Sequence, residues 1–449
     1  MKEAVTAVFV HDDEVFVIRR QEHLRAFPGY YAFPGGKVDE QDAGYDYEHP
    51  LLAAHHPTHV RALYRELSEE LGYDLTHALE RGDIGGIHLM GTAVTPAFET
   101  YRFQAHHFKI VLNERPRFIP DSNEIAWSDW VHREELWGRY DRGEGLMVVP
   151  TINLIRALAR DPSTEWVEPF NLDYDASRKL PCLELIRGLR YIPVPSRTLP
   201  PARFTNALII GDGGAKAPRW LVDPSPKDEL EYRKLVHTLE DWTLDGILIS
   251  HHHPDHHQYA PDLARLLDVP LACTAITEQR LEASQGGEYL RGVTVRHIRD
   301  GEHLTRWLDR DVHCHRLPGH DDGMVGIAPE DLSWFFVGDL IQTEGTVVIP
   351  EPEGDMRDYF ESLEALIGKG PKAIIPSHGM PAGGVHLLRR TLDHRRMREA
   401  QVHSLSQAGR NSEEIVAAIY QGVDKRLLPL AAQNVRQHLR KLTAEGRIG

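Results

Sequence analysis

Cysteine is scarce in this chain, and so are long apolar runs. Its 449 residues include only three cysteines, at positions 182, 273 and 314. They are too few and too scattered for a disulfide framework, so we expect a reducing, cytoplasmic location. No apolar run approaches the roughly 18 residues of a membrane-spanning helix, and the N-terminus lacks the pattern of a signal peptide. We therefore expect no membrane association.

An excess of positive charge is also lacking. The 51 Lys and Arg residues are outnumbered by 67 Asp and Glu residues, which gives a net charge of −16 at pH 7. Such a balance argues against nucleic-acid binding by the whole surface, although it leaves a local basic face open. The length predicts about three domains at roughly 150 residues each. Alternating apolar strands and amphipathic helices favour an α/β class.

Histidine, by contrast, is concentrated where one apolar stretch ends. Residues 246–249 read GILI, and residues 250–257 then read SHHHPDHH. Imidazole and carboxylate groups suit zinc and similar divalent ions. His251 and His253 lie two residues apart and share a side in extended chain, whereas Asp255 and His256 turn toward a second point. The alternative interpretation is a solvated histidine-rich loop.

Three further candidate ligands follow downstream, each after an apolar strand and a Gly or Pro turn: His320, Asp339 and His378. The set, in this order, resembles the metallo-β-lactamase superfamily over residues 185–395. The resemblance implies an αββα sandwich in which Asp223 lies near the metal loop. It implies two zinc ions, the first held by His251, His253 and His320, the second by Asp255, His256 and His378, with Asp339 bridging. Such ions share a hydroxide, and Asp255 would be the catalytic hydrogen-bond acceptor for it.

The N-terminal part carries a second signature. Residues 27–39 (FPGYYAFPGGKVD) and 65–72 (RELSEELG) resemble the two halves of the Nudix box. Helical spacing predicts an apolar stripe on one face of the second segment and places three carboxylates on the other, with Gly72 ending the helix. Those carboxylates are Glu66, Glu69 and Glu70. Clustered carboxylates need a hard cation, so we expect Mg²⁺ or Mn²⁺ there, with Glu69 catalytic.

This Nudix-like box departs from the usual pattern in two ways. Asp42 stands where glutamate is usual, and an insertion over 43–58 contains His55 and His56. The long insertion resembles the coenzyme A diphosphatase branch of the family. Two other interpretations stay open: a merely solvated acidic face, and a Nudix fold that has lost catalysis.

The last 56 residues are locally basic. From residue 394 onward, ten Arg or Lys residues stand against five Asp or Glu. Asn411 or Ser412 is expected to cap a first helix, and 428–445 to form a second. That second helix is expected to bury Val435, Leu439 and Leu442 and to expose Arg436, Arg440 and Lys441. A winged-helix domain that contacts the phosphates of single-stranded RNA is one interpretation, and a helical cap on the metal domain is the other.

Together, these patterns predict a Nudix-like domain (1–150), a connector (151–184), a metallo-β-lactamase-fold domain (185–393) and a winged-helix-like domain (394–449). Segments 317–324, 338–341 and 355–363 resemble the beta-lactamase-like protein 2 branch. That resemblance implies phosphodiester hydrolysis, and related proteins also hydrolyse thioesters. We expect a zinc hydrolase of an ester, thioester or CoA-like small molecule. The alternatives are a single-strand endoribonuclease with the C-terminal domain as nucleic-acid handle, and a binding protein with a degenerate Nudix domain.

Overall fold

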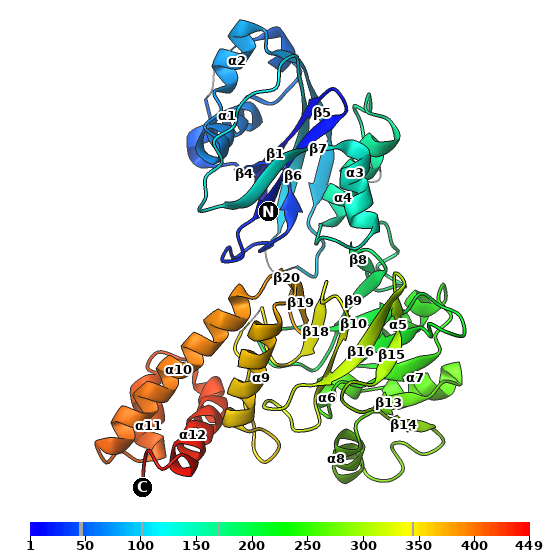
Figure 1. The fold of residues 1–449 in the computed structure, drawn as a ribbon, viewed down its shortest axis with the longest axis vertical. Helices are drawn as coiled ribbons and strands as arrows, with labels where there is room; N and C mark the ends of the chain where they lie inside the picture. The colour runs from blue at the N-terminus through cyan, green and yellow to red at the C-terminus, as the bar shows by residue number, and fades with distance from the viewer. Residues whose placement is uncertain (45–47, 100–101, 169, 344) are drawn as a thin grey trace. The chain divides into compact units, whose positions relative to one another are not determined.

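The computed structural model describes residues 1–44, 48–99, 102–168, 170–343 and 345–449. They divide into two units (Figure 1). The first comprises Met1–Tyr174 and Leu183–Arg187, and the second comprises Asp175–Cys182 and Gly188–Gly449. None of the described helices is long and apolar enough to cross a membrane.

The first unit is built on a mixed sheet with helices on both faces. Its path runs β3-β2-β1-β6-β5, with β4 paired to β1 and β7 paired to β2. The strands are β1 (Lys2–His11), β2 (Glu14–Arg20), β3 (Tyr31–Ala32), β4 (Gly35–Lys37), β5 (Ile84–Val94), β6 (Phe103–Leu112) and β7 (Ile125–His132). The helices are α1 (Pro57–Leu71), α2 (Leu75–Arg81), α3 (Arg133–Asp141) and α4 (Val149–Arg160).

Alternation along β1 creates two cores in this unit. Val5 and Phe9 pack with α1 and α2, whereas Val8 and Val10 pack with α3 and α4, because successive strand residues point to opposite faces. Helix α1 ends where expected, at Gly72, whose φ of 59° is left-handed. Residues 45–47 of the predicted insertion lie outside the described residues.

The predicted connector differs from the structure in its first half. Residues 151–160 belong to helix α4, which places Ile152, Ile155 and Leu158 in the same core as strand β2. Val167 and Phe170 join that core further along the chain. The first unit therefore extends well past residue 150.

The second unit contains two packed sheets flanked by helices, which confirms the predicted αββα sandwich. One sheet runs β14-β13-β12-β11-β10-β9 and the other β15-β16-β17-β18-β19-β20. The first consists of β9 (Leu189–Pro195), β10 (Phe204–Ile210), β11 (Trp220–Val222), β12 (Gly246–Leu248), β13 (Leu271–Cys273) and β14 (Val295–His297), and is covered by α5 (Glu229–Leu239), α7 (Ala260–Leu267) and α8 (Ala275–Gln285). The second consists of β15 (His303–Trp307), β16 (Arg310–Arg316), β17 (Val325–Pro329), β18 (Phe335–Gly338), β19 (Ala373–Pro376) and β20 (Ala382–Gly383), and is covered by α9 (Met356–Lys369) and α10 (His386–Gln407).

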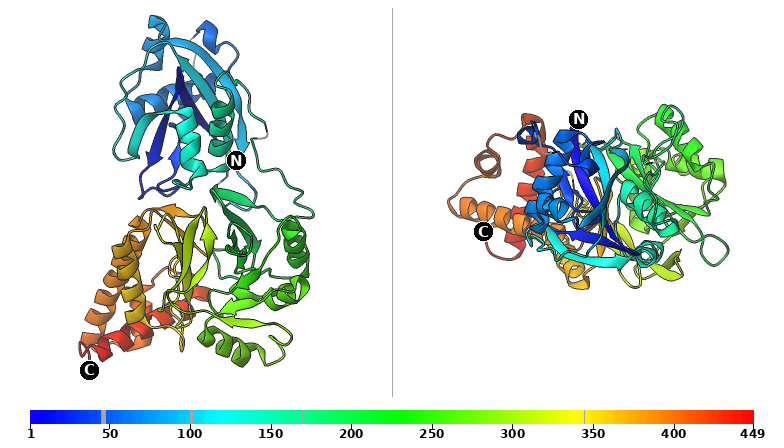
Figure 2. Two further views of the ribbon diagram at one scale, coloured as in Figure 1. Left: turned by 45° about the vertical axis from the view of Figure 1, so that its right-hand side comes forward. Right: turned by 90° about the horizontal axis from the view of Figure 1, so that it is seen from above.

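Three helices close the chain, drawn orange to red in Figure 2: α10, α11 (Ser412–Ile419) and α12 (Leu428–Ala444). Asn411 caps α11 through a reciprocal capping box with Glu414. The expected burial of Val435 and Leu442 is confirmed, and Leu439 is partly buried.

The expected exposure of Lys441 is wrong. Its side chain is only 9% exposed and pairs with Glu399 of α10 at 3.0 Å and with Glu445 at 2.8 Å. The periodicity of α12 identified the face toward α11 correctly, but it gave no sign of the acidic partner on α10.

Candidate metal centre

The seven predicted ligands of the second unit converge at the ends of its strands. The loop after β12 supplies His251 and His253, and the short helix α6 (Pro254–His257) supplies Asp255 and His256. The other three follow strands of the second sheet: His320 lies between β16 and β17, Asp339 directly follows β18, and His378 follows β19. Loops from both sheets therefore meet at one place.

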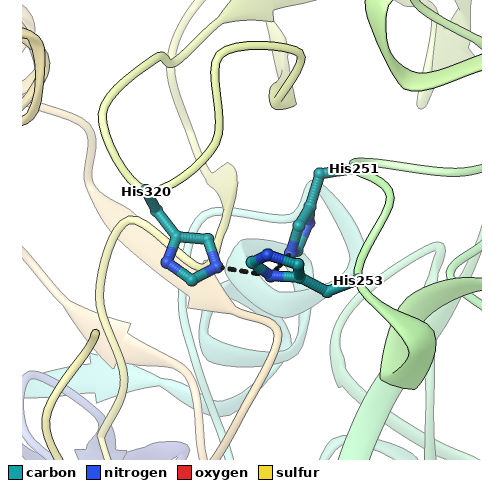
Figure 3. A group of neighbouring side chains, drawn as sticks. All are labelled: His251, His253 and His320. Carbon is teal, nitrogen blue, oxygen red and sulfur yellow. Dashed lines mark hydrogen bonds between the residues drawn. The ribbon is translucent and has the colours of Figure 1, made fainter. Parts of the chain in front are cut away.

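Two separate groups of donors form there. In the first, His253 Nδ1 lies 3.0 Å from His251 Nε2 and 2.9 Å from His320 Nε2, as Figure 3 shows. In the second, Asp255 lies 3.7 Å from His256 Nε2 and 3.4 Å from His378 Nε2. The ligand atoms of each group lie within 4.8 Å of one another.

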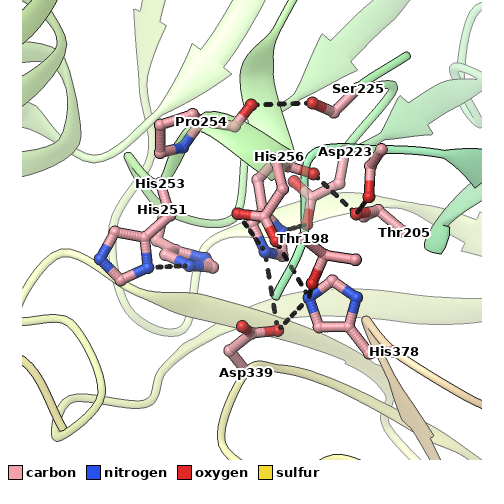
Figure 4. A network of polar contacts seen from close by, with 12 residues as sticks. Thr198, Thr205, Asp223, Ser225, His251, His253, Pro254, His256, Asp339 and His378 are labelled. Carbon is pink, nitrogen blue, oxygen red and sulfur yellow. Dashed lines mark hydrogen bonds and ion pairs between the residues drawn. The ribbon is translucent and has the colours of Figure 1, made fainter. Parts of the chain in front are cut away.

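Asp339 stands between the two groups, with one oxygen toward each (Figure 4). Its Oδ1 lies 3.6 Å from His256 Nε2 and 3.3 Å from His378 Nε2. Its Oδ2 lies 3.7 Å from His320 Nε2. A carboxylate placed in this way is suited to bridge two cations.

Bonds outside the centre orient the imidazoles. His320 Nδ1 donates to the carbonyl of Val348 at 2.6 Å, and His378 Nδ1 donates to the carbonyl of Phe204 at 2.8 Å. His253 reaches Glu353 through its outer nitrogen at 3.2 Å. Because each outer nitrogen is engaged, the inner nitrogen presents its lone pair to the centre, as in metal sites of known proteins.

The carboxylate of Asp223 accepts more hydrogen bonds than the other described side chains around the candidate ligands. It is fully buried and accepts three hydrogen bonds, from the Ser250 amide at 2.7 Å, the Ser250 hydroxyl at 2.6 Å and His256 Nδ1 at 2.9 Å. The short acidic turn that contains Asp223 therefore holds both the start of the histidine loop and one candidate ligand.

The donor set fits metal ions. His256 Nε2 and Asp339 Oδ1 are buried without a hydrogen-bond partner among the described residues, a costly state unless a cation or other group satisfies them. Burial lowers the pKa of His320 to about 4, and burial also lowers that of His251, so both are neutral. With no cation at the centre, the carboxylates of Asp339 and Asp255 outweigh burial and raise the pKa of His378 to about 10, so that a proton on this ring occupies the place that a cation would take.

The centre has an enclosed side and an open side. His251, His256, His378, His320 and Asp339 are buried. His253 and Asp255 are only half-buried. A substrate would therefore approach over these two side chains.

Several residues that surround the candidate ligands were not predicted from the sequence. His252 pairs with the buried Asp321, and Glu353 pairs with His253. Asp321 directly follows His320 in the PGHDDG segment, so its position was a usable signal. Glu353 carried no such signal, because it lies in a turn with no ligand beside it.

The acidic residues of α1 do not converge in the same way. Glu70 is buried, accepts the Gly35 amide at 2.8 Å and has a pKa raised to about 8 by burial. Glu66 pairs with Arg65 at 2.8 Å, and Glu69 is 61% exposed. In the part of the chain that the structure describes, these three carboxylates are not among the donor groups that lie within 4.8 Å of one another. Glu66 and Glu70 both face the Gly35–Gly36 turn, since a Cβ at Gly36 would lie 2.4 Å from the Glu66 carboxylate. A cation held by the three carboxylates therefore stays a prediction.

Asp42, which replaces the usual glutamate, has a structural partner. It is fully buried and forms a two-point pair with Arg65, at 3.1 Å to Nε and 3.0 Å to Nη2. Arg65 also donates to the carbonyl of Lys37 at 2.7 Å. Arg65 therefore links helix α1 to the segment 37–42 that precedes the insertion.

Comparison with known proteins agrees with this architecture. Residues 1–147 match the model of the NUDIX domain, residues 200–378 that of the metallo-beta-lactamase superfamily, and residues 412–449 that of the beta-lactamase associated winged helix domain. A beta-lactamase-like protein 2 homolog of Drosophila melanogaster is 27% identical over 256 residues, which is 54% of this chain and 84% of that protein. An atrochrysone carboxyl ACP thioesterase of Pseudocercospora fijiensis (strain CIRAD86) is also 27% identical over 256 residues, 54% of this chain and 71% of that one.

A solved structure shows the same central fold. A beta-lactamase domain protein from Burkholderia ambifaria covers 62% of this chain and 91% of its own, with a TM-score of 0.52 and 21% identity. The two hydrolase-family domains support a metal-dependent hydrolase. Residues 200–378 thus form a domain of the metallo-beta-lactamase superfamily, preceded in this chain by a NUDIX domain and followed by a beta-lactamase associated winged helix domain.

Proposed function

We propose that the second unit is a dinuclear zinc hydrolase that cleaves an ester-type bond, with a thioester as its first candidate substrate. The position of Asp339 carries the proposal, since its two oxygens face two separate groups of three donors. One ion would be held by His251, His253 and His320, the other by Asp255, His256 and His378, and Asp339 would contact both.

Zinc bound in such a site supplies Lewis-acid polarisation of the oxygen under attack and a hydrolytic nucleophile at neutral pH. The chain itself supplies orientation. Asp255 lies on the open side, where its carboxylate can accept a hydrogen bond from the attacking water. Glu353 fixes the ring of His253 at the same edge through a 3.2 Å contact.

The choice of a thioester over RNA rests on one relative, on the negative net charge of the chain and on the acidic partners of its C-terminal basic residues. A protein with 27% identity bears the name of a thioesterase, and the chain's net charge of −16 gives no general attraction for nucleic acid. Two of the three basic residues expected to meet RNA have acidic partners, since Arg436 lies 2.9 Å from Glu351 and Lys441 lies 3.0 Å from Glu399. Single-stranded RNA is accordingly the second substrate to test.

The test is an activity screen of the zinc-loaded full chain on an acyl-CoA thioester and a single-stranded RNA. We expect thioester hydrolysis that falls at least 100-fold in Asp255→Asn and is unchanged in Asp262→Asn, whose exposed carboxylate lies nearby on α7. Equal activity in the two variants would overturn the assignment of Asp255. Hydrolysis of RNA without hydrolysis of thioester would overturn the substrate class.

A Mg²⁺- or Mn²⁺-dependent diphosphatase in the first unit is a second candidate. It is favoured by the buried contact of Glu70 with the Gly35 amide, which fixes the glycine turn against the acidic helix. We expect Glu69→Gln to abolish cleavage of a CoA-type diphosphate and to leave the zinc-dependent hydrolysis intact. If both activities fall together, the two-site interpretation is wrong.

A further inference from the structure

A second set of metal-type donors lies in the first unit, away from the acidic residues of α1. It consists of Glu3 on β1, His59 in the first turn of α1 and His106 on β6, and their ligand atoms all lie within 4.8 Å of one another. At a rise of about 1.5 Å per residue, His59 lies roughly 10 Å along the helix from Glu66. The two sets of donors are therefore distinct.

The strand register explains why these residues meet. Strands β1 and β6 are parallel neighbours, with Val5 opposite His106 and Glu3 two residues before Val5. Glu3, Val5 and His106 therefore share a face of the sheet. Val5 belongs to the core that α1 covers, so the start of α1 brings His59 onto the same face.

His59 and Glu3 are paired with each other, whereas one ring nitrogen of His106 lacks a hydrogen-bond partner among the described residues. His59 Nε2 lies 2.8 Å from Glu3 Oε2, and the rings of His59 and His106 stack with centroids 4.0 Å apart. His106 is 8% exposed, and its Nδ1 bonds to the Thr92 hydroxyl at 3.1 Å. Its Nε2 is buried with no hydrogen-bond partner among the described residues. A buried polar atom left in this state destabilises the fold, so this nitrogen calls for a ligand.

We propose that Glu3, His59 and His106 form a further metal site, which binds one zinc-class divalent ion. Two imidazoles and one carboxylate are a typical zinc donor set, whereas Mg²⁺ prefers oxygen donors alone. With zinc–nitrogen bonds of about 2.0–2.1 Å, neighbouring donors of a tetrahedral site lie roughly 3.3 Å apart. The Glu3 side chain, 46% exposed, can supply the small adjustment, while Thr92 fixes His106.

Such an ion would have a definite structural effect. It would join the N-terminal strand β1, strand β6 and the start of α1, whose first two residues are the last two of the insertion over 43–58. The Glu3 side chain is 46% exposed, so the fourth coordination position faces solvent. Zinc would therefore slow the local opening of β1, because a ligand that binds only the folded form stabilises it.

The experiment compares zinc binding by the full-length chain and its variants, after removal of metal and reloading with a measured excess of zinc. We expect His59→Gln and Glu3→Gln each to hold one zinc ion fewer than the wild type. His77→Gln, which changes an exposed histidine on α2, is the matched control and should hold the wild-type number. His106→Gln should also lose one ion, and the two more exposed positions still decide the question if this buried variant fails to fold.

Hydrogen exchange locates the ion independently of the metal centre in the second unit. Zinc should slow amide exchange in β1 at least several-fold in the wild type and in His77→Gln, but not in His59→Gln. Equal zinc content in the wild type, His59→Gln and Glu3→Gln, or exchange in β1 that ignores zinc, would overturn the proposal. Neither result would bear on the ligands around Asp339.

Discussion

Replacing Lys441 tests whether helix α12 is held in place by its charges. Its Nζ lies 3.0 Å from Glu399 and 2.8 Å from Glu445, and 4.9 Å from the ring centre of Phe360. Glu399 is itself only 8% exposed and also receives Arg447 at 2.8 Å. Lys441→Met keeps the apolar stem of the side chain and removes the charge.

The pKa of Glu399 indicates how much stability the charge of Lys441 contributes. Burial works against the charged form, but His438, Lys441 and Arg447 outweigh it and lower the pKa from 4.5 to about 2. At about 1.4 kcal/mol per pH unit, the net effect of burial and of these partners is about 3 kcal/mol. Lys441 is one of three partners that stabilise this carboxylate, so we expect Lys441→Met to cost about 1–2 kcal/mol. Arg440→Met, on the exposed side of the same helix, should cost less than about 0.5 kcal/mol.

Native-state hydrogen exchange of the α12 amides measures this local stability. The expected loss corresponds to exchange that is about 5- to 30-fold faster in Lys441→Met at pH 7. The pKa of Glu399 is lowered in the folded state, so its stabilising effect is complete above pH 4.5 and is lost as pH falls toward 2. The difference between the variant and the wild type should shrink over that range. Equal exchange in Lys441→Met and Arg440→Met, or a difference independent of pH, would refute the reasoning.

Two further substitutions test the supports of the two sites. Asp223→Asn removes the charge that accepts from Ser250 and His256, so zinc affinity measured by chelator competition should fall about 10- to 100-fold; an affinity equal to that of Asp262→Asn would contradict this role. Arg65→Met leaves the buried Asp42 without its cation, so urea unfolding of the first unit should show a loss of about 3–5 kcal/mol. The exposed Arg81→Met serves as its control, and equal unfolding of the two variants would argue against a buried pair.

The candidate metal ligands of the second unit were predictable because their signal is local. Each one follows an apolar strand and a tight turn, and the ends of neighbouring strands meet at one edge of a sheet. His320 and His378 are far from His251 in sequence, and it was the resemblance of the whole set to the metallo-β-lactamase superfamily that implied that all three would meet. The two NUDIX half-motifs and the glycine that ends α1 were local in the same sense.

What the sequence did not reveal depends on contacts between distant segments. Lys441 was expected to be exposed because its helix shows one apolar face, whereas Glu399 comes from 42 positions earlier. Glu70 was expected on the acidic face of α1, but its contact with the Gly35 amide depends on a segment 35 residues earlier in the chain. His106 and Glu3 carried no motif at all, since only the register of β1 against β6 brings them together.

Zinc-edge anomalous diffraction from crystals of the zinc-loaded chain would show whether the candidate metal centre holds two ions. We predict two peaks at the ends of the second unit's strands. One should lie about 2.0–2.1 Å from nitrogens of His251, His253 and His320, and the other at similar distances from His256 and His378. Asp339 should place one oxygen on each ion. A single peak at this site, or none, would contradict the dinuclear centre.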